Sequence, residues 1–144
     1  MSRLDPNWQL DSRLHNDTIP VFENGGLTLL LMNDSRWPWL ILVPKISGAE
    51  ELHDLDPEIR QAVLDIAVSI GEKLKQFSDC DKINIAAIGN MVRQLHIHII
   101  ARSEGDANWP APVWGYGQAD CYAPERASEL AEKLKEILFD TPLS

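Results

Sequence analysis

Residues 94–102 read QLHIHIIAR, and this stretch places two of the chain's four histidines one residue apart in an aliphatic run. In a β-strand successive side chains point to opposite faces, so Gln94, His96 and His98 are predicted to share one face. Two imidazoles spaced about 7 Å apart along a strand can converge on one small group, such as a phosphate. A neutral imidazole that is hydrogen-bonded through one nitrogen can attack phosphorus with the other, and water can then cleave the N-linked intermediate. Gln94 and His98 would position and stabilise the charged oxygens.

Two other interpretations of the histidine pair stay open. Both rings could lie on a solvated sheet face or be satisfied by backbone carbonyls. A His-x-His pair on a strand is also a usable zinc pair, but a zinc site needs further ligands. His15 and His53 stand in poorly specified contexts, and no cluster of cysteines accompanies the pair. The prediction therefore includes no metal site.

Three apolar runs that precede the histidines are predicted to be β-strands. They cover residues 19–23, 27–33 and 39–44. The turn-forming residues 24–26, Asn-Gly-Gly, lie between the first two runs and predict a hairpin, and Pro38 marks a break before the third. Three consecutive strands of this kind predict an antiparallel meander.

A long amphipathic helix is predicted to follow the meander. Asp56 is suited to the N-cap and Pro57 to the first helical position. Apolar residues then recur at steps of three and four, as one face of a helix requires; they are Ile59, Val63, Ile66, Ala67, Ile70, Leu74 and Phe77.

The rest of the chain predicts a second hairpin, a long loop and a second helix. Residues 83–88 and 91–100 form the hairpin around Gly89-Asn90, and residues 124–139 form the helix. The segment 103–120 is rich in Gly, Pro and Trp and has no regular period, which indicates a functional or partner-contacting loop. The element order predicts an α+β fold in which helices pack on one side of an antiparallel sheet, in a single domain over residues 1–144.

Composition and charge exclude several classes of protein. A hydrophobic fraction of 44% and a charged fraction of 24% are ordinary for a globular domain. The net charge of -9, without a cluster of Lys or Arg, argues against a nucleic-acid-binding surface but allows a small phosphorylated ligand. No apolar run is long enough for a membrane span, and Cys80 and Cys121 are predicted to be reduced, structural thiols. We expect a cytoplasmic protein.

The stretch GNMVRQLHIHIIARSEGD resembles the signature of the histidine triad (HIT) family of nucleotide hydrolases and transferases, in which three histidines alternate with apolar residues. Gln94 stands where the first histidine of the triad belongs. The order LLLMND, ILVP and LHDLDPE is also similar to the family's nucleoside-binding strand, neighbouring strand and helix entry. The resemblance covers roughly residues 20–106 and is to members such as the diadenosine polyphosphate hydrolases.

The resemblance implies a HIT-like five-stranded antiparallel sheet with two main helices, in a homodimer. It implies cleavage at the α-phosphate of a dinucleoside polyphosphate, such as diadenosine tetraphosphate, or of a nucleoside phosphoramidate. His96 would be the nucleophile and form a nucleotidyl intermediate, His98 would contact phosphate, Asn90 would support the α-phosphate and Asn33 would contact ribose. No cofactor is implied, and a divalent cation is compatible with a polyphosphate substrate. Gln94 can form hydrogen bonds but cannot titrate, so a proton relay through this position would be lost.

Several of these positions also have simpler interpretations. Asn33 and Asn90 are typical turn residues. Arg102 could clamp a phosphate or lie exposed at the end of its strand. Many family members carry a histidine before the third strand, where this chain has Trp37 and Trp39, and a tryptophan there could stack on a base or pack in the core. The alternative function is a nucleotide-binding or interaction module with little or no turnover.

Overall fold

The computed structural model describes residues 5–140, except for the side chain of Asp140. Its five strands form one sheet in the order β1-β2-β3-β5-β4, and all neighbouring strands are antiparallel. This confirms the α+β class and the meander of the first three strands. The strands are β1 (Thr18–Glu23), β2 (Leu27–Met32), β3 (Trp39–Pro44), β4 (Lys82–Ala86) and β5 (Ile97–Arg102).

The first hairpin is closed by a side chain of its own turn. The Oδ1 atom of Asn24 accepts the N–H groups of Gly26 at 2.8 Å and Leu27 at 3.0 Å. These two bonds reverse the chain between β1 and β2, because they satisfy the backbone donors that the turn leaves unpaired.

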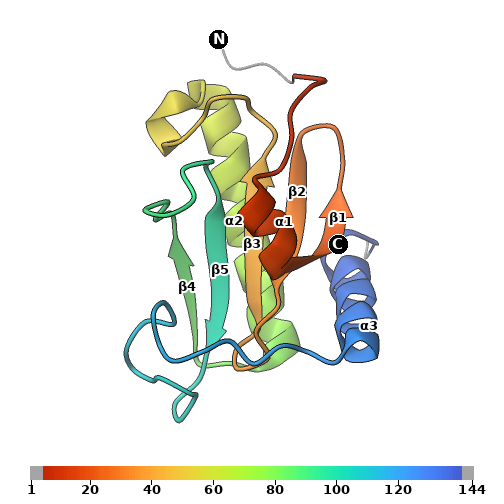
Figure 1. Ribbon diagram of the computed structural model, residues 1–144, viewed down its shortest axis with the longest axis vertical. Coiled ribbons are helices and arrows are strands. Elements are labelled where there is room, and N and C mark those ends of the chain that lie inside the picture. The colour runs from red at the N-terminus through yellow and green to blue at the C-terminus, as the bar shows by residue number, and fades with distance from the viewer. Residues whose placement is uncertain (1–4, 141–144) are drawn as a thin grey trace.

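Helices cover both faces of the sheet. Figure 1 shows α2 behind the sheet and α1 in front of it. Only α2 and α3 were predicted, and the N-terminal helix α1 is an addition to the predicted elements. The last turn of the predicted C-terminal helix is a π-helix, η2. The helices are α1 (Ser12–Asp17), the 3₁₀-helix η1 (Leu52–Asp54), α2 (Pro57–Ser78), α3 (Pro124–Lys135) and η2 (Glu136–Asp140).

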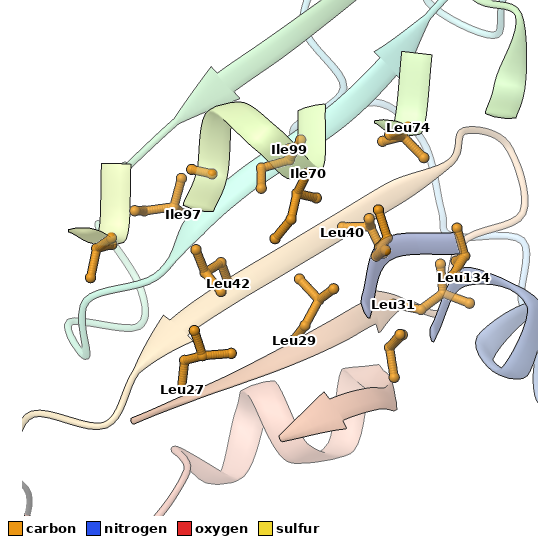
Figure 2. Packing of buried hydrophobic residues seen from close by; sticks show 14 of the residues in the cluster. Leu27, Leu29, Leu31, Leu40, Leu42, Ile70, Leu74, Ile97, Ile99 and Leu134 are labelled. Atoms are coloured by element: carbon orange, nitrogen blue, oxygen red, sulfur yellow. The ribbon is translucent and has the colours of Figure 1, made fainter. Parts of the chain in front are cut away.

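The larger core lies between the sheet and the helices α2 and α3. Alternate residues of the central strands point into it, as Figure 2 shows for Leu40 and Leu42 of β3 and for Ile97 and Ile99 of β5. Their partners come from the predicted apolar faces of the two helices. These are Ile70 and Leu74 of α2 and Leu134 of α3.

The opposite face of the sheet is covered by α1 and by the loop 103–120. Leu14 of α1 and Val113 of the loop pack against Ile41 and Ile100 of the central strands. The prediction that helices lie on one side therefore holds for α2 and α3 but not for α1. The layer formed by α1 and the loop 103–120 borders the functional site, because the side chains of His98 and Ile100 in β5 point toward this layer.

The second hairpin pairs as predicted, with Ala86 of β4 opposite His98 of β5. The prediction of its turn was wrong, because β5 begins only at Ile97 and residues 87–96 form a longer connection. The reason is a contact outside the hairpin: the N–H of Leu95 donates to the carbonyl of Ala49 at 3.0 Å instead of extending the ladder. His96 therefore lies at the end of the connection, directly before the strand.

Of the helices that the structure describes, none combines the length and apolar character needed to cross a bilayer. Both cysteines are free thiols. Cys80 is buried in the larger core, whereas Cys121 is exposed, so the prediction of a structural thiol was wrong for Cys121.

Candidate functional site

The structure brings the two histidines of the QLHIHIIAR stretch together at one cavity. Their ring centroids lie 4.9 Å apart, and each residue is only 5% exposed. A cavity of about 460 Å³ borders both rings and is also lined by Asn90 and Trp114. We call it the histidine cavity. Its volume is that of a small-molecule pocket.

The ring of His96 is oriented by a backbone carbonyl. Its Nδ1 lies 2.7 Å from the carbonyl oxygen of Gln94. Because a carbonyl oxygen can only accept, Nδ1 must carry the hydrogen in this contact. In the neutral ring the lone pair is then on Nε2, and this is the nitrogen available to attack an electrophile.

His98 has the opposite arrangement of hydrogen and lone pair. The indole Nε1–H of Trp39 donates to Nδ1 of His98 at 3.0 Å, so Nδ1 is an acceptor and the hydrogen of the neutral ring lies on Nε2. Burial, followed by the nearby charge of His96, lowers the pKa of His98 to about 3. His98 is therefore neutral at physiological pH, and the two rings offer one Nε2 lone pair and one Nε2–H group.

The buried, neutral state of His98 predicts a specific dependence of stability on pH. Its pKa is about 3 in the fold, against 6.5 in the unfolded chain. Between these values the unfolded chain binds a proton that the folded chain does not, so lowering the pH favours unfolding. We expect this residue to reduce the free energy of unfolding by about 1.4 kcal/mol per pH unit as the pH falls from 6 to 4.

Urea unfolding of the wild type and of His98→Gln at pH 7, 6, 5 and 4 measures this contribution. Glutamine keeps an acceptor for Trp39 but cannot titrate, so its stability should fall less steeply with decreasing pH. Equal slopes in the two proteins would show that His98 does not change its protonation on unfolding.

The two predicted asparagines lie at different cavities. Asn90 lines the histidine cavity together with His96 and His98. Asn33 lines a neighbouring cavity of about 330 Å³, and its Oδ1 accepts the N–H of Tyr122 at 2.9 Å. The two cavities have four lining residues in common and therefore adjoin each other. The shared residues are Asp17, Met32, Trp114 and Gly115.

Gln94 faces the N-terminal segment and is not among the residues that line the histidine cavity. Its Oε1 accepts the N–H of Asp11 at 2.9 Å, and its Nε2 donates to the carbonyl of Gln9 at 2.9 Å. Both ends of the amide are therefore used to fasten the segment that leads into α1. The expectation that its side chain stabilises phosphate oxygens is not met, because its hydrogen-bonding groups are directed elsewhere.

Arg102 is neither exposed nor directed at the histidine cavity, which corrects both interpretations of this residue. It is 1% exposed, and its Nε and Nη2 donate to the two carboxylate oxygens of Asp106 at 2.8 and 3.0 Å. Nη1 donates to Oδ1 of Asn84, and Nη2 also donates to the carbonyl of Ala111. The guanidinium thus holds the start of the loop 103–120 against β4 and β5.

A second ion pair fixes the other end of this loop. Arg36 binds Asp34 through Nε at 2.9 Å and Nη2 at 2.8 Å, and its Nη1 donates to the carbonyl of Tyr116 at 2.6 Å. Burial raises the pKa of Asp34, but the hydrogen bonds from Arg36 outweigh this effect and leave the pKa below its usual value. Asp34 also accepts the N–H of Asp120. The loop is therefore held in the position that places Trp114 beside His98.

Several residues of the cavity were not predicted. Arg13 and Asp17 come from α1, and Met32 comes from the end of β2. Local sequence patterns do not predict these residues, because α1 is placed at the cavity by contacts with distant segments. Gln94 binds the residues that lead into α1, and Leu14 packs against the central strands. Trp114 lies with its ring centroid 5.1 Å from that of His98, and the aromatic content of the loop was a signal for it.

Within residues 5–140, no group of three or more His, Cys, Asp or Glu side chains is arranged to hold a metal ion.

Comparisons with known proteins identify the family to which this fold belongs. The family model of the HIT domain matches residues 13–105. A histidine triad protein from Sinorhizobium meliloti is 44% identical, with a TM-score of 0.87 and coverage of 91% of this chain and 97% of that chain. A histidine triad protein from Marinobacter aquaeolei is 41% identical, with a TM-score of 0.89 and coverage of 94% and 98%. None of the curated proteins matches. The matched family model and these relatives show that the chain belongs to the histidine triad (HIT) family.

Proposed function

We propose that the protein is a nucleotide hydrolase or nucleotidyl transferase that acts at the α-phosphate through a covalent nucleotidyl-His96 intermediate. HIT proteins are generally nucleotide-processing enzymes, although some are non-catalytic. The observation that carries the proposal is the contact between Nδ1 of His96 and the Gln94 carbonyl, because it leaves Nε2 as the lone-pair nitrogen at the cavity.

The proposed reaction has two displacements at phosphorus. In the first, the Nε2 lone pair of His96 forms a bond to the α-phosphorus, and the bond from phosphorus to the leaving group breaks. The leaving group departs as a nucleoside polyphosphate, or as an amine that takes up a proton. In the second, a water oxygen bonds to phosphorus, the N–P bond breaks and a proton is released, so that nucleoside monophosphate and free His96 result. Another nucleophile in place of water gives nucleotidyl transfer.

Neighbouring groups are suited to the charge that develops on the phosphate. The Nε2–H of His98 is a hydrogen-bond donor close to His96, and the Asn90 amide lines the same cavity. Donors that are fixed before the reaction stabilise the transition state without having to reorganise. Arg13 and Asp17 also line the cavity, and the guanidinium of Arg13 is a group that can bind a phosphate.

These features support a dinucleoside polyphosphate, such as diadenosine tetraphosphate, or a nucleoside phosphoramidate as the substrate. Asn33, in the adjoining cavity, is a ribose-contacting residue in this proposal. The chemistry requires no cofactor, and a divalent cation would accompany a polyphosphate as part of the substrate. We expect the reaction to take place in the cytoplasm.

One observation favours a second candidate, a nucleotide-binding module with little or no turnover. The amide of Gln94 binds Gln9 and Asp11, and an amide cannot titrate, so the first triad position supplies no titratable group to the cavity. A pocket of this kind would keep nucleotide affinity without a proton relay.

The test is to incubate the protein with diadenosine tetraphosphate and, separately, with an adenosine phosphoramidate, and to separate the products by chromatography. Calorimetry with adenosine monophosphate measures binding in parallel. Release of adenosine monophosphate from either substrate supports the enzyme. Binding of adenosine monophosphate without product formation from either substrate across the pH range would support the binding module instead.

HIT proteins commonly form dimers, and we propose that this chain is a homodimer that joins through β4. This strand is one of the two edges of the sheet, the other being β1, which α3 contacts. Apolar residues on and after β4 are exposed, with Ile85 at 45%, Ile88 at 41% and Met91 at 77%. An exposed apolar edge strand is a ready surface for association. Analytical ultracentrifugation should give twice the mass of the chain for the wild type and a smaller mass for Ile85→Lys. A monomeric wild type at micromolar concentration would contradict the proposal.

A further inference from the structure

Trp39 is the direct partner of His98 across the sheet. It begins β3 and pairs with Ile100, which places its side chain diagonally beside His98 on the same face. Its indole Nε1 lies 3.0 Å from Nδ1 of His98, and both residues are buried, at 6% and 5% exposure. From the sequence, this tryptophan was expected to stack on a base or to pack in the core. In the structure its N–H group donates a hydrogen bond to His98.

The indole itself is held in place by two further rings. The centroids of Trp37 and Trp114 each lie 6.2 Å from that of Trp39, in edge-to-face arrangements at 70° and 89°. Edge-to-face contacts of this kind stabilise ring orientation. Packing therefore sets the direction of the Trp39 N–H group, and the ring of His98 must present an acceptor to it.

A fixed donor leaves His98 only one favourable state. If Nδ1 carried a hydrogen, two N–H groups would face each other between buried side chains, and neither would have its present partner. If the ring turned over, a carbon would replace Nδ1 and leave the buried indole N–H without an acceptor. The favourable state is the neutral ring with Nδ1 toward Trp39 and the hydrogen on Nε2.

We propose that Trp39 is a positioning residue, which holds His98 in the Nε2–H form so that His98 presents a hydrogen-bond donor beside His96 and not a second lone pair. The division of roles between the two rings then comes from their partners: the Gln94 carbonyl for His96 and the Trp39 indole for His98. The effect on reaction rate rests on the proposed function, whereas the effect on the ring of His98 does not.

Nuclear magnetic resonance tests the ring of His98 directly. In ¹⁵N-labelled protein at pH 7, we expect the His98 nitrogens to show the Nε2–H form and a scalar coupling between Trp39 Nε1 and His98 Nδ1 across the hydrogen bond. Trp39→Phe removes the donor, so the coupling should disappear and the His98 nitrogens should shift toward a mixture of the two neutral forms. An Nδ1–H form in the wild type, or unchanged His98 shifts in Trp39→Phe, would overturn the inference.

A second variant changes the N–H group without changing the shape of the side chain. Incorporation of 3-benzothienylalanine at position 39 replaces the indole N–H with sulfur and keeps the bicyclic ring. With diadenosine tetraphosphate under single-turnover conditions, we expect formation of the His96 adduct to slow about tenfold or more. The matched control is the same replacement at Trp8, which lines neither the histidine cavity nor the cavity of Asn33 and which should keep the wild-type rate.

The two measurements separate the inference from the proposed function. Equal adduct rates with indole and benzothienyl side chains at position 39 would overturn the positioning role while leaving His96 as the nucleophile. If the wild type forms no adduct and no product, the proposed function fails, and the spectra alone decide whether Trp39 sets the form of His98.

Discussion

Replacing His96 with alanine is expected to slow cleavage of a dinucleoside polyphosphate by about a thousandfold or more. Among the described residues that line the histidine cavity, His96 alone offers an Nε2 lone pair, because the hydrogen of His98 lies on Nε2, and the variant loses it. His98 therefore cannot replace it without breaking its bond to Trp39. Single-turnover measurements with excess protein report this chemical step without the influence of product release.

The matched control for this prediction is His53→Ala. His53 is exposed, lies in η1 and lines neither the histidine cavity nor the cavity of Asn33. We expect it to react at the wild-type rate. A His96→Ala protein that keeps more than about a tenth of the wild-type rate would contradict a nucleophilic role, because loss of a nucleophile has a much larger effect than loss of a binding contact.

Replacing Arg102 with methionine is expected to lower the free energy of unfolding by about 3–5 kcal/mol, which is typical when one partner of a buried ion pair is removed. Burial would raise the pKa of Asp106, but hydrogen bonds from the Arg102 guanidinium and the Ser103 N–H outweigh this effect, so the pKa lies well below the usual range. Without Arg102 the carboxylate is left buried and without its main partner. Urea unfolding at pH 7 measures the loss.

A surface ion pair provides the comparison. Arg93 binds Glu50 at 3.2 Å, but the two side chains are 75% and 47% exposed, so Arg93→Met should cost less than about 1 kcal/mol. The double variant Arg102→Met/Asp106→Asn should lose less stability than the sum of its single variants, because it leaves no unpaired charge. An Arg102→Met protein as stable as Arg93→Met would refute the structural role of this pair.

The fold was largely predictable from local patterns. Apolar runs bounded by turn-forming residues located β1, β2 and β3, and the period of three to four residues located α2 and α3. The alternation of side chains along a strand placed Ile97 and Ile99 in the core and the two histidines on the opposite side. These predictions succeeded because each depends on residues that are close together in the sequence.

The remaining features depend on contacts between segments that are distant in sequence. α1 is attached through Gln94, more than eighty residues later, and β5 begins late because Leu95 binds Ala49. The partner of His98 is Trp39 on another strand. No period or turn signal encodes such contacts, so the first triad position was expected to face a phosphate although its amide binds the N-terminal segment.

The role of Arg102 also depends on contacts that the local sequence does not reveal. Its position at the end of a histidine-bearing strand suggested a phosphate clamp, and its charge suggested exposure. The loop 103–120 folds back and supplies Asp106 and the Ala111 carbonyl, which satisfy the guanidinium inside the protein. A charged residue at a strand end can be assigned only once the course of the following loop is known.

The most direct test of the central claim is to identify the residue that carries the nucleotide. The protein is mixed with a stoichiometric amount of diadenosine tetraphosphate, quenched in denaturant at alkaline pH during the first turnover, digested and mapped by mass spectrometry. We predict one adenosine monophosphate on the peptide that contains residues 94–102, attached to His96 and lost on brief treatment with acid. Adenosine monophosphate attached to any other residue, or product release in the first turnover without an adduct on His96, would contradict the account.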